Sequence, residues 1–284
     1  MSKVLVTGAT GFLGSYVIEA LLQKGCVVIA TASGITSAAS KEWYNKVKFI
    51  PLDLNKIDES VNYYTYFDQP DSMIHLAWQG LPNYTSDFHM TENLPIQLEF
   101  LQNLLQHGLK DLTVTGTCLE YGMQEGCLSE SLPAKPENPY AIAKHRLQEA
   151  LTILTDQNQA RFKWVRLFYM YGKGQNPKSL FSQLEKAMEE KLEVFNMSGG
   201  EQIRDFLPVE KMAEYIVDIA VQNNTTGIIN CCSGEPVKLK ELVTRFLKER
   251  NSNIRLNLGY YPYTTYEPMN FWGDTKKLTT IIKA

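Results

Sequence analysis

The sequence has few cysteines, no surplus of positive charge and no long hydrophobic run. Its five cysteines are an odd number and form no C-x-x-C pair, which disfavours a disulfide framework and a zinc site. The 28 basic residues are offset by 31 acidic ones, which disfavours nucleic-acid binding. No apolar run approaches the about 18 residues of a membrane span, and residues 1–7 lack a signal-peptide pattern. We expect a soluble, unprocessed, cytoplasmic protein with no metal, membrane or nucleic-acid partner.

The sequence does contain enough apolar residues to bury a substantial core. Hydrophobic residues make up 44% of the 284 and charged residues 21%, which is the ordinary range for globular proteins. This length suits two domains, or one large α/β body with a smaller lobe.

Short apolar runs alternate along the chain with segments of helical periodicity. Strands are expected at residues 3–7, 26–31, 47–50, 73–77, 112–115 and 162–168, and helices at residues 16–22, 94–105 and 140–154. Such alternation predicts an α/β fold, a doubly wound parallel (Rossmann) sheet with a smaller C-terminal substrate-binding lobe. We expect residues 1–168 to form the dinucleotide-binding domain, which a strand near residues 226–232 rejoins. Residues 169–284 are expected to form mainly the substrate-binding lobe.

Three glycines, Gly8, Gly11 and Gly14, fill the turn between the first strand and the first helix. Glycines at such a turn let backbone N–H groups and the helix N-terminus approach a pyrophosphate. Their spacing departs from G-x-G-x-x-G, so a tight turn without a ligand is the alternative. The position between strand and helix favours dinucleotide binding, for which we expect contacts from Gly8, Thr10, Gly11, Phe12, Leu13 and Gly14.

The end of the second strand bears on which dinucleotide is bound. NAD-binding proteins usually carry an acidic residue about 20 residues past the glycines to bind the ribose. Here Ala32, Ser33 and Gly34 stand in that place, so no carboxylate repels a 2′-phosphate and Ser33 can receive it. This favours NADP(H) over NAD(H). Asp53, after the third strand, is placed to bind the adenine amine or to cap a loop or helix.

Tyr140 and Lys144 carry the strongest chemical signal. A spacing of four residues places both side chains on one face of a helix, where the ammonium is expected to lower the pKa of the phenol. Tyr140 would then serve as the general acid for a carbonyl oxygen or the base for an alcohol. Thr117 follows a strand whose carboxyl end should face the cofactor, so it is placed to donate to the same oxygen.

With these motifs the chain resembles extended short-chain dehydrogenases/reductases of the sugar-nucleotide epimerase/dehydratase family, over nearly its whole length. The matching pieces are the three glycines, Asp53-Leu54, His75 to Ala77, Asn93, Thr117 with Tyr121-Gly122, Asn138 to Tyr140 with Lys144, Arg166 with Tyr171-Gly172, and Gly200 with Arg204-Asp205-Phe206 and Val209.

The resemblance implies roles for these residues. Thr117, Tyr140 and Lys144 would form the catalytic triad, with Lys144 also on the nicotinamide ribose. Cofactor contacts are implied for Asp53, Leu54, Leu76 and Ala77. It also implies a homodimer through the helices at residues 94–105 and 141–154.

A nucleotide-diphosphate sugar is the implied substrate. Arg204 would grip its pyrophosphate, for which a guanidinium fork is suited, unless it instead pairs with Asp205. Tyr169 stands where many relatives have Asn, so the sugar contacts are expected to differ there. Glu120 is unusual for the family and is assigned either to a sugar hydroxyl or to capping an outward-facing loop.

Departures from the family pattern narrow the reaction. The Asp-Glu pair of the dehydratases is replaced by Cys118-Leu119, and the cysteine that reductases with added epimerase activity place two residues after the catalytic hydroxyl is Leu119. We therefore expect NAD(P)H-dependent reduction of the 4-keto group of a nucleotide-linked 6-deoxyhexose, such as dTDP-4-dehydro-6-deoxyglucose to dTDP-fucose, in polysaccharide (O-antigen) precursor synthesis. The alternatives are a 4-epimerase with tightly bound NAD and a nonenzymatic dinucleotide-sensing protein.

Overall fold

A seven-stranded parallel sheet forms the body of the protein, in a computed structural model that describes residues 2–265 and 267–283. The strand order is β11-β7-β5-β4-β1-β2-β3. The strands are β1 (Lys3–Thr7), β2 (Val27–Thr31), β3 (Lys48–Phe49), β4 (Ser72–His75), β5 (Asp111–Thr117), β7 (Arg161–Leu167) and β11 (Gly227–Cys231). Because the order reverses between β1 and β4, their carboxyl ends border the crevice in which such sheets bind ligands.

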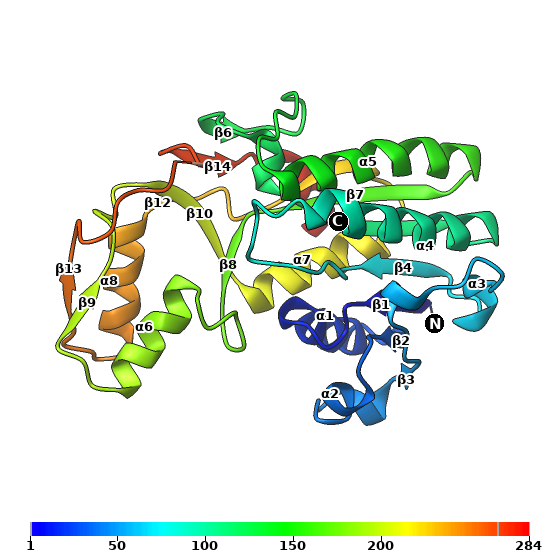
Figure 1. Cartoon of the computed structure of the whole chain (residues 1–284), viewed down its shortest axis with the longest axis horizontal. Helices are drawn as coiled ribbons and strands as arrows, with labels where there is room; N and C mark the ends of the chain where they lie inside the picture. The colour runs from blue at the N-terminus through cyan, green and yellow to red at the C-terminus, as the bar shows by residue number, and fades with distance from the viewer. Residues whose placement is uncertain (1, 266, 284) are drawn as a thin grey trace.

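Helices cover both faces of this sheet (Figure 1). One face carries α1 (Phe12–Gln23), α7 (Val209–Val221) and α9 (Lys276–Ile282), and the other carries α3 (Tyr63–Tyr66), α4 (Leu94–Gln106) and α5 (Pro139–Gln157). Successive residues of β1 point into opposite layers, with Val4 and Val6 in one core and Leu5 in the other. A strand buried on both faces has to be apolar at every position, which explains the continuous apolar run of β1.

A smaller lobe lies beside the sheet, at the left of Figure 1. It contains a three-stranded sheet, a two-stranded sheet and two helices. These are β8 (Tyr169–Tyr171), β10 (Ile203–Pro208), β12 (Pro236–Lys238), β9 (Val194–Asn196), β13 (Arg255–Asn257), α6 (Leu180–Glu189) and α8 (Leu239–Glu249). The lobe has its own core, built largely from phenylalanine and leucine side chains of α6 and α8.

The remaining elements are short. They are β6 (Gly126–Leu128) paired with β14 (Phe271–Gly273), α2 (Ile35–Ala39), η1 (Tyr44–Lys46), η2 (Leu54–Lys56), the π-helix η3 (His89–Asn93) and the 3-10 helix η4 (Cys118–Tyr121). The chain passes between the two parts more than once, because α7, β11 and α9 follow lobe segments and pack on the sheet body.

The parallel sheet with helices on both faces confirms the predicted α/β class. Within residues 2–265 and 267–283, no helix combines the length and apolar character that a bilayer crossing needs.

Candidate active site

The glycine turn packs tightly against the end of β4. Gly8 has a φ of 67°, and a Cβ there would lie 2.9 Å from the Ala77 backbone nitrogen. A Cβ on Gly14 would collide with the carbonyl oxygen of Gly8. Helix α1 begins at Phe12 with Gly11 as its N-cap and no side-chain hydrogen bond at that cap, so its first N–H groups can receive an anion. This cradle fits the pyrophosphate of a dinucleotide.

The ends of β1 and β4 are held together by Thr7. Its Oγ1 accepts hydrogen bonds from the backbone nitrogens of Leu76 and Ala77, at 3.2 and 3.3 Å, and lies 2.9 Å from His75 Nδ1. Burial lowers the pKa of His75 to about 3. His75 is therefore a neutral structural residue that helps to hold the ends of β1 and β4 together.

The other residues expected at the cofactor lie around the same crevice edge. Ser33 is exposed just beyond the end of β2, and Thr10 and Leu13 are half-buried in the glycine turn. Asp53 caps η2, where its Oδ1 accepts from the Asn55 backbone nitrogen at 3.1 Å. The structure thus shows the capping role of Asp53, and Leu54 behind it is buried.

Thr117, Tyr140 and Lys144 come together at the carboxyl end of β5. Thr117 is the last residue of that strand, and Tyr140 is in the first turn of α5, which Asn138 caps by accepting from the Ala141 nitrogen at 2.9 Å. Lys144, one turn later, donates from Nζ to the Thr115 carbonyl oxygen at 2.8 Å. The three side chains are buried, and a hydrogen bond links Thr117 with the Tyr140 phenol.

Burial dominates the electrostatics of this group. It raises the pKa of Tyr140, and the hydrogen bond with Thr117 opposes that rise only in part. Burial also lowers the pKa of Lys144 to about 7, against the attraction of the Glu120 charge. The sequence predicted a lowered Tyr140 pKa, and the structure corrects this, because burial and the nearby Glu120 charge both raise it.

Trp78 is a site residue that the sequence reasoning missed. Lys144 Nζ lies 4.0 Å from the centroid of its ring, in cation–π contact. The indole N–H donates to His89 Nδ1 at 3.2 Å, and the His89 ring lies 5.3 Å from that of Tyr140. The π-helix η3 supplies His89, so an irregular helical turn helps to enclose the triad.

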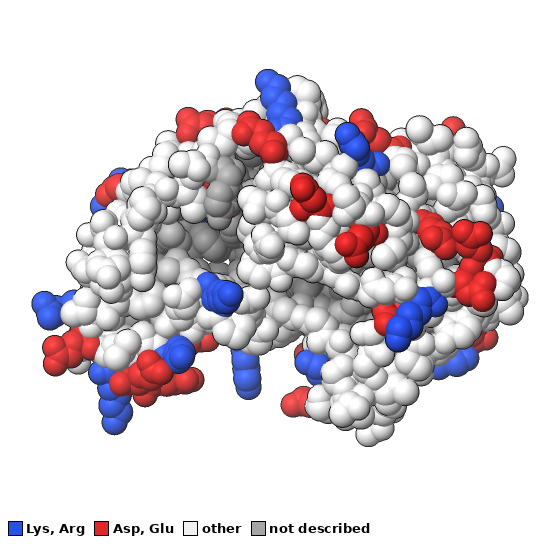
Figure 2. All heavy atoms as spheres, viewed as in Figure 1, with Lys and Arg blue, Asp and Glu red and all other residues white. Residues whose placement is uncertain are grey.

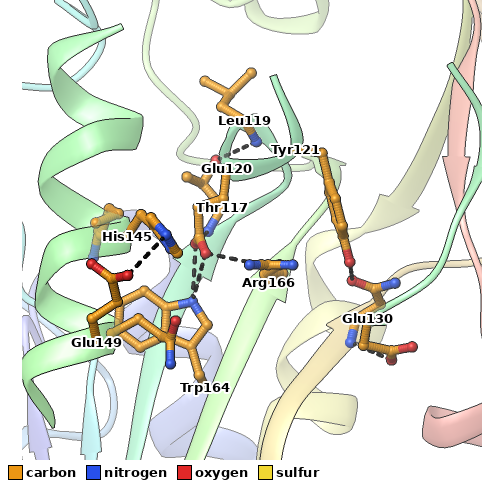
Figure 3. Close-up of polar contacts among 12 residues, drawn as sticks. Thr117, Leu119, Glu120, Tyr121, Glu130, His145, Glu149, Trp164 and Arg166 are labelled. Carbon is orange, nitrogen blue, oxygen red and sulfur yellow. Dashed lines mark hydrogen bonds and ion pairs between the residues drawn. The ribbon is translucent and has the colours of Figure 1, made fainter. Parts of the chain in front are cut away.

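Glu120 does not lie where the sequence suggested. Its side chain is 0% exposed, and its carboxylate accepts from the Thr117 nitrogen at 2.8 Å, from Trp164 Nε1 at 3.0 Å and from Arg166 Nε at 2.9 Å (Figure 3). A carboxylate enclosed by these donors has no free face for a sugar hydroxyl. Glu120 instead caps η4 from inside the protein. The structure therefore corrects both predicted roles of Glu120, the contact with a sugar hydroxyl and the capping of an outward-facing loop.

Arg204 is buried and does not pair with Asp205. Its Nη2 lies 3.1 Å from Glu267 Oε2, and its guanidinium covers the Phe271 ring at 4.5 Å. Asp205 instead accepts from the backbone nitrogens of Ser233 and Gly234, at 2.7 and 2.9 Å. The Asp205 alternative is therefore wrong, and Glu267 is a partner that sequence spacing could not indicate because it lies 63 residues further along the chain.

Tyr169 lies next to Arg204, whose guanidinium is 5.9 Å from its ring centroid. Its ring also packs 5.2 Å from Phe206 and 6.0 Å from Phe271. Burial, with the Glu267 charge, raises the pKa of Tyr169. The molecule is hollowed between the lobe and the sheet body, as Figure 2 shows. Two lobe residues expected to bind substrate, Tyr169 and Arg204, therefore form one cluster.

Comparison with known proteins agrees with this geometry. The profile of the NAD dependent epimerase/dehydratase family matches residues 4–232. The dTDP-6-deoxy-L-talose 4-dehydrogenase (NAD(+)) of Aggregatibacter actinomycetemcomitans is 30% identical over 277 residues, covering 95% of this chain and 99% of that protein. The GDP-6-deoxy-D-talose 4-dehydrogenase of the same organism is 28% identical, covering 82% of this chain and 74% of that protein.

A solved structure has the same fold. The UDP-glucuronic acid 4-epimerase from Bacillus cereus, in complex with NAD, superposes with a TM-score of 0.82 at 25% identity, covering 99% of this chain and 90% of that one. The family profile matches most of the chain, and a relative at 30% identity spans nearly all of it. The protein thus belongs to the NAD dependent epimerase/dehydratase family.

Proposed function

We propose that the protein is an NAD(P)H-dependent reductase of the 4-keto group of a nucleotide-linked 6-deoxyhexose. The observation that carries this proposal is the cluster of Thr117, Tyr140 and Lys144, which are buried together at the carboxyl end of β5, with Tyr140 as the phenolic proton donor. A protonated phenol suits a reduction, in which the ketone oxygen must gain a proton. The two relatives named as 6-deoxytalose 4-dehydrogenases support this proposal, because dehydrogenation and ketone reduction are one reaction in opposite directions.

The chain has suitable groups to hold the dinucleotide. The pyrophosphate would lie over Gly8, Gly11 and the N-terminus of α1, and Lys144 would reach the nicotinamide ribose. When bound, the reduced nicotinamide supplies the hydride for the carbonyl carbon.

Tyr140 then donates its proton to the carbonyl oxygen. Thr117 assists at the same oxygen, because its Oγ1 already accepts from the Leu119 nitrogen at 3.3 Å and its own proton is available for donation. Lys144 fixes the ribose and, when protonated, stabilises negative charge that develops on Tyr140. The products are the alcohol at C4 and the oxidised dinucleotide.

We propose that NADP(H) is preferred over NAD(H). Ser33 is exposed beyond β2, and the Ala32-Ser33-Gly34 segment brings no carboxylate against a 2′-phosphate. One relative is named for NAD(+), so the choice needs a direct measurement. Measuring kcat/KM with NADPH and with NADH tests this preference. A higher kcat/KM with NADH than with NADPH would reject it.

Arg204 remains our proposed contact for the substrate diphosphate. Its guanidinium lies near Tyr169 and is paired with Glu267. The diphosphate would therefore have to share the guanidinium with the Glu267 carboxylate or displace that carboxylate. The sugar product would serve polysaccharide precursor synthesis in the cytoplasm.

A 4-epimerase with tightly bound NAD is the second candidate, because it needs the same triad and the similar Bacillus cereus protein is a 4-epimerase. It predicts dinucleotide that stays bound through purification and no net consumption of reduced cofactor. A nonenzymatic dinucleotide sensor would not need Tyr140 and Lys144 buried together with Thr117, and their presence argues against it.

The direct test is to incubate the purified protein with NADPH and a panel of nucleotide-linked 4-keto-6-deoxysugars that differ in base and sugar. Loss of reduced-nicotinamide absorbance, together with a product hydroxylated at C4, is the expected result. Interconversion of C4 epimers without loss of NADPH would instead establish the epimerase.

A further inference from the structure

A buried carboxylate lies directly behind the catalytic threonine. We propose that Glu120 is a positioning residue of this site, which holds the backbone of Thr117 at the end of β5 and stabilises the cationic form of Lys144 through the protein interior. The inference rests on the proposed function for its catalytic consequence. The positioning of Thr117 and the effect on Lys144 are inferred from contacts within this chain and do not depend on the proposed function.

The first part of the role is geometric. Glu120 Oε1 accepts the Thr117 N–H at 2.8 Å, while Thr117 Oγ1 accepts the Leu119 N–H at 3.3 Å, so the two residues form a reciprocal capping box around η4 (Figure 3). The Leu119 bond occupies an acceptor site of the threonine hydroxyl and leaves its proton to be donated. Glu120 therefore fixes both the backbone and, indirectly, the direction of the catalytic hydroxyl.

The carboxylate is itself held from β7. Trp164 Nε1 donates to it at 3.0 Å and Arg166 Nε at 2.9 Å, and all three side chains are buried. Gly116 makes this approach possible, because a Cβ there would collide with both Trp164 Nε1 and the Glu120 carboxylate. Strands β5 and β7, together with Gly116, thus form a buried pocket that holds the Glu120 carboxylate.

The second part of the role is electrostatic. Lys144 Nζ lies 5.9 Å from the centroid of the Trp164 ring, whose Nε1 donates to Glu120, so one indole contacts both charged groups. His75 from β4 also interacts with Lys144, Tyr140 packs on the Trp78 ring that Lys144 contacts, and Arg166 on β7 pairs with Glu120. His75 is neutral because burial lowers its pKa to about 3, and Tyr140 is neutral because burial raises its pKa. Glu120 is thus the negative charge among these groups, and it opposes the loss of the lysine proton that burial favours.

The test measures Lys144 directly, so it does not depend on catalysis. In the full-length protein, carbon-13 at Cε of lysine reports each ammonium titration, and the Lys144 signal is assigned by its loss in Lys144→Met. We expect Glu120→Gln to lower the Lys144 pKa by about one unit from its value near 7. An unchanged Lys144 pKa in Glu120→Gln would overturn the proposal.

Two variants control this measurement. Glu130→Gln makes the same chemical change in a carboxylate that accepts from the Asn230 nitrogen at 2.9 Å and has no hydrogen bond to Thr117, so the Lys144 pKa should not move. Glu120→Asp keeps the charge, so most of the native pKa should return. A fall in Glu130→Gln as large as in Glu120→Gln would also reject the assignment.

A double variant covers the case in which the single change prevents folding. Glu120→Gln leaves Arg166 buried without its partner, whereas Glu120→Gln with Arg166→Met removes both charges together. The double variant is compared with Arg166→Met alone, because both proteins lack the arginine and differ only in the Glu120 charge, so the double variant should have the lower Lys144 pKa. An equal Lys144 pKa in these two folded proteins contradicts the proposal.

Activity provides the second readout. If the wild-type protein reduces 4-keto sugars, the alkaline limb of kcat/KM should move to lower pH in Glu120→Gln by the same amount as the Lys144 titration. Absence of ketone reduction in the wild type would remove the proposed function and leave the titration result valid. A shifted titration with an unshifted alkaline limb would reject the catalytic part of the Glu120 role.

Discussion

At the scale of single residues, burial moves the pKa values of Tyr140 and Lys144 in opposite directions. The phenol holds its proton because desolvation disfavours the phenolate, whereas the ammonium tends to lose its proton for the same reason. A protonated phenol is ready to give a proton to a ketone. In the opposite, alcohol-oxidising direction the same phenol would have to ionise first, so we expect oxidation to require more alkaline pH than reduction.

Replacing Tyr140 with phenylalanine removes the proton donor and little else. We expect Tyr140→Phe to lower kcat by about 10²–10⁴-fold, because general acid catalysis is lost, while the dissociation constant for NADPH changes by less than about threefold. Steady-state kinetics and a fluorescence titration of NADPH measure the two quantities. Undiminished turnover in a folded variant would remove Tyr140 from the role assigned here.

The buried Lys144 also predicts how stability varies with pH. Its pKa near 7 in the folded chain lies below the usual lysine value, so the cost of the buried cation is full below pH 7 and is relieved as pH rises above 7. Lys144→Met should be more stable than wild type by about 2 kcal/mol at pH 6. That difference should fall by about 1.4 kcal/mol per pH unit between pH 7.5 and 9.5, so that it changes sign within this range and the wild type becomes the more stable protein.

Denaturant unfolding of both proteins at several pH values measures this difference. Gln148→Met, a change at a half-buried, uncharged position one turn later on α5, serves as the control and should show no such trend. A constant difference between Lys144→Met and wild type across this range would mean that Lys144 stays charged in the folded protein.

Local spacing predicts some site residues and not others. The four-residue interval between Tyr140 and Lys144 indicates their shared helix face, because helical geometry acts over one turn. The partners of Glu120 lie 44 and 46 residues away on β7, and only the register of β5 with β7 brings them into contact. The direction of the Tyr140 pKa shift likewise depends on long-range packing.

At the scale of elements, the glycines of the β1–α1 turn are proposed to allow the dinucleotide pyrophosphate to bind there. We expect Gly14→Ala to lower stability by about 2 kcal/mol and NADPH affinity by more than tenfold, because its Cβ would press on the Gly8 and Ala9 carbonyls. Gly25→Ala is the matched control. Gly25 follows the same helix at a φ of 73° with nothing within 4 Å of a Cβ, so stability should fall by about 1 kcal/mol without loss of affinity.

Thermal unfolding and NADPH titration distinguish these two outcomes. Equal affinity losses in Gly14→Ala and Gly25→Ala would show that the effect reflects general destabilisation. Undiminished NADPH affinity in a folded Gly14→Ala protein would contradict the proposed binding site of the pyrophosphate.

Elements with a strong local pattern were predictable, and those defined by distant pairing were not. The strands Lys3–Thr7 and Arg161–Leu167 lie where apolar runs predicted them. The three-residue strand β6 acquires its form from pairing with β14, about half the chain away, which no local pattern reveals. Helix α8 did carry a usable signal in Leu242, Val243, Phe246 and Leu247, which recur at helical spacing.

At the scale of the whole molecule, helix α1, which follows the glycine turn, contacts the segment that follows β8. The Tyr16 hydroxyl on α1 donates to the Lys173 carbonyl oxygen at 2.8 Å, just beyond β8, and Phe12 packs against Tyr16. The cofactor cradle is therefore tied to the segment that enters the lobe. This link provides a physical route by which dinucleotide binding can affect the hollow where the sugar is proposed to bind.

The implied homodimer is a prediction at the same scale. We expect sedimentation equilibrium at micromolar concentration to give twice the 32.3 kDa chain mass. Ile153 on α5 is 60% exposed, and Ile153→Glu should shift the protein toward monomer. Ile35→Glu, at a 54% exposed isoleucine of α2, should not. A monomeric wild-type protein would reject the pairing of α4 and α5 across a dimer.

The most direct test of the central claim follows the hydride itself. NADPH deuterated at the transferring position of its nicotinamide is incubated with the protein and the nucleotide-linked 4-keto-6-deoxyhexose that the panel identifies, and the product is analysed by NMR. We predict one deuterium at sugar C4 for each NADPH oxidised, with the rate severely reduced in Tyr140→Phe. C4 epimers that form without deuterium and without NADPH oxidation would contradict it.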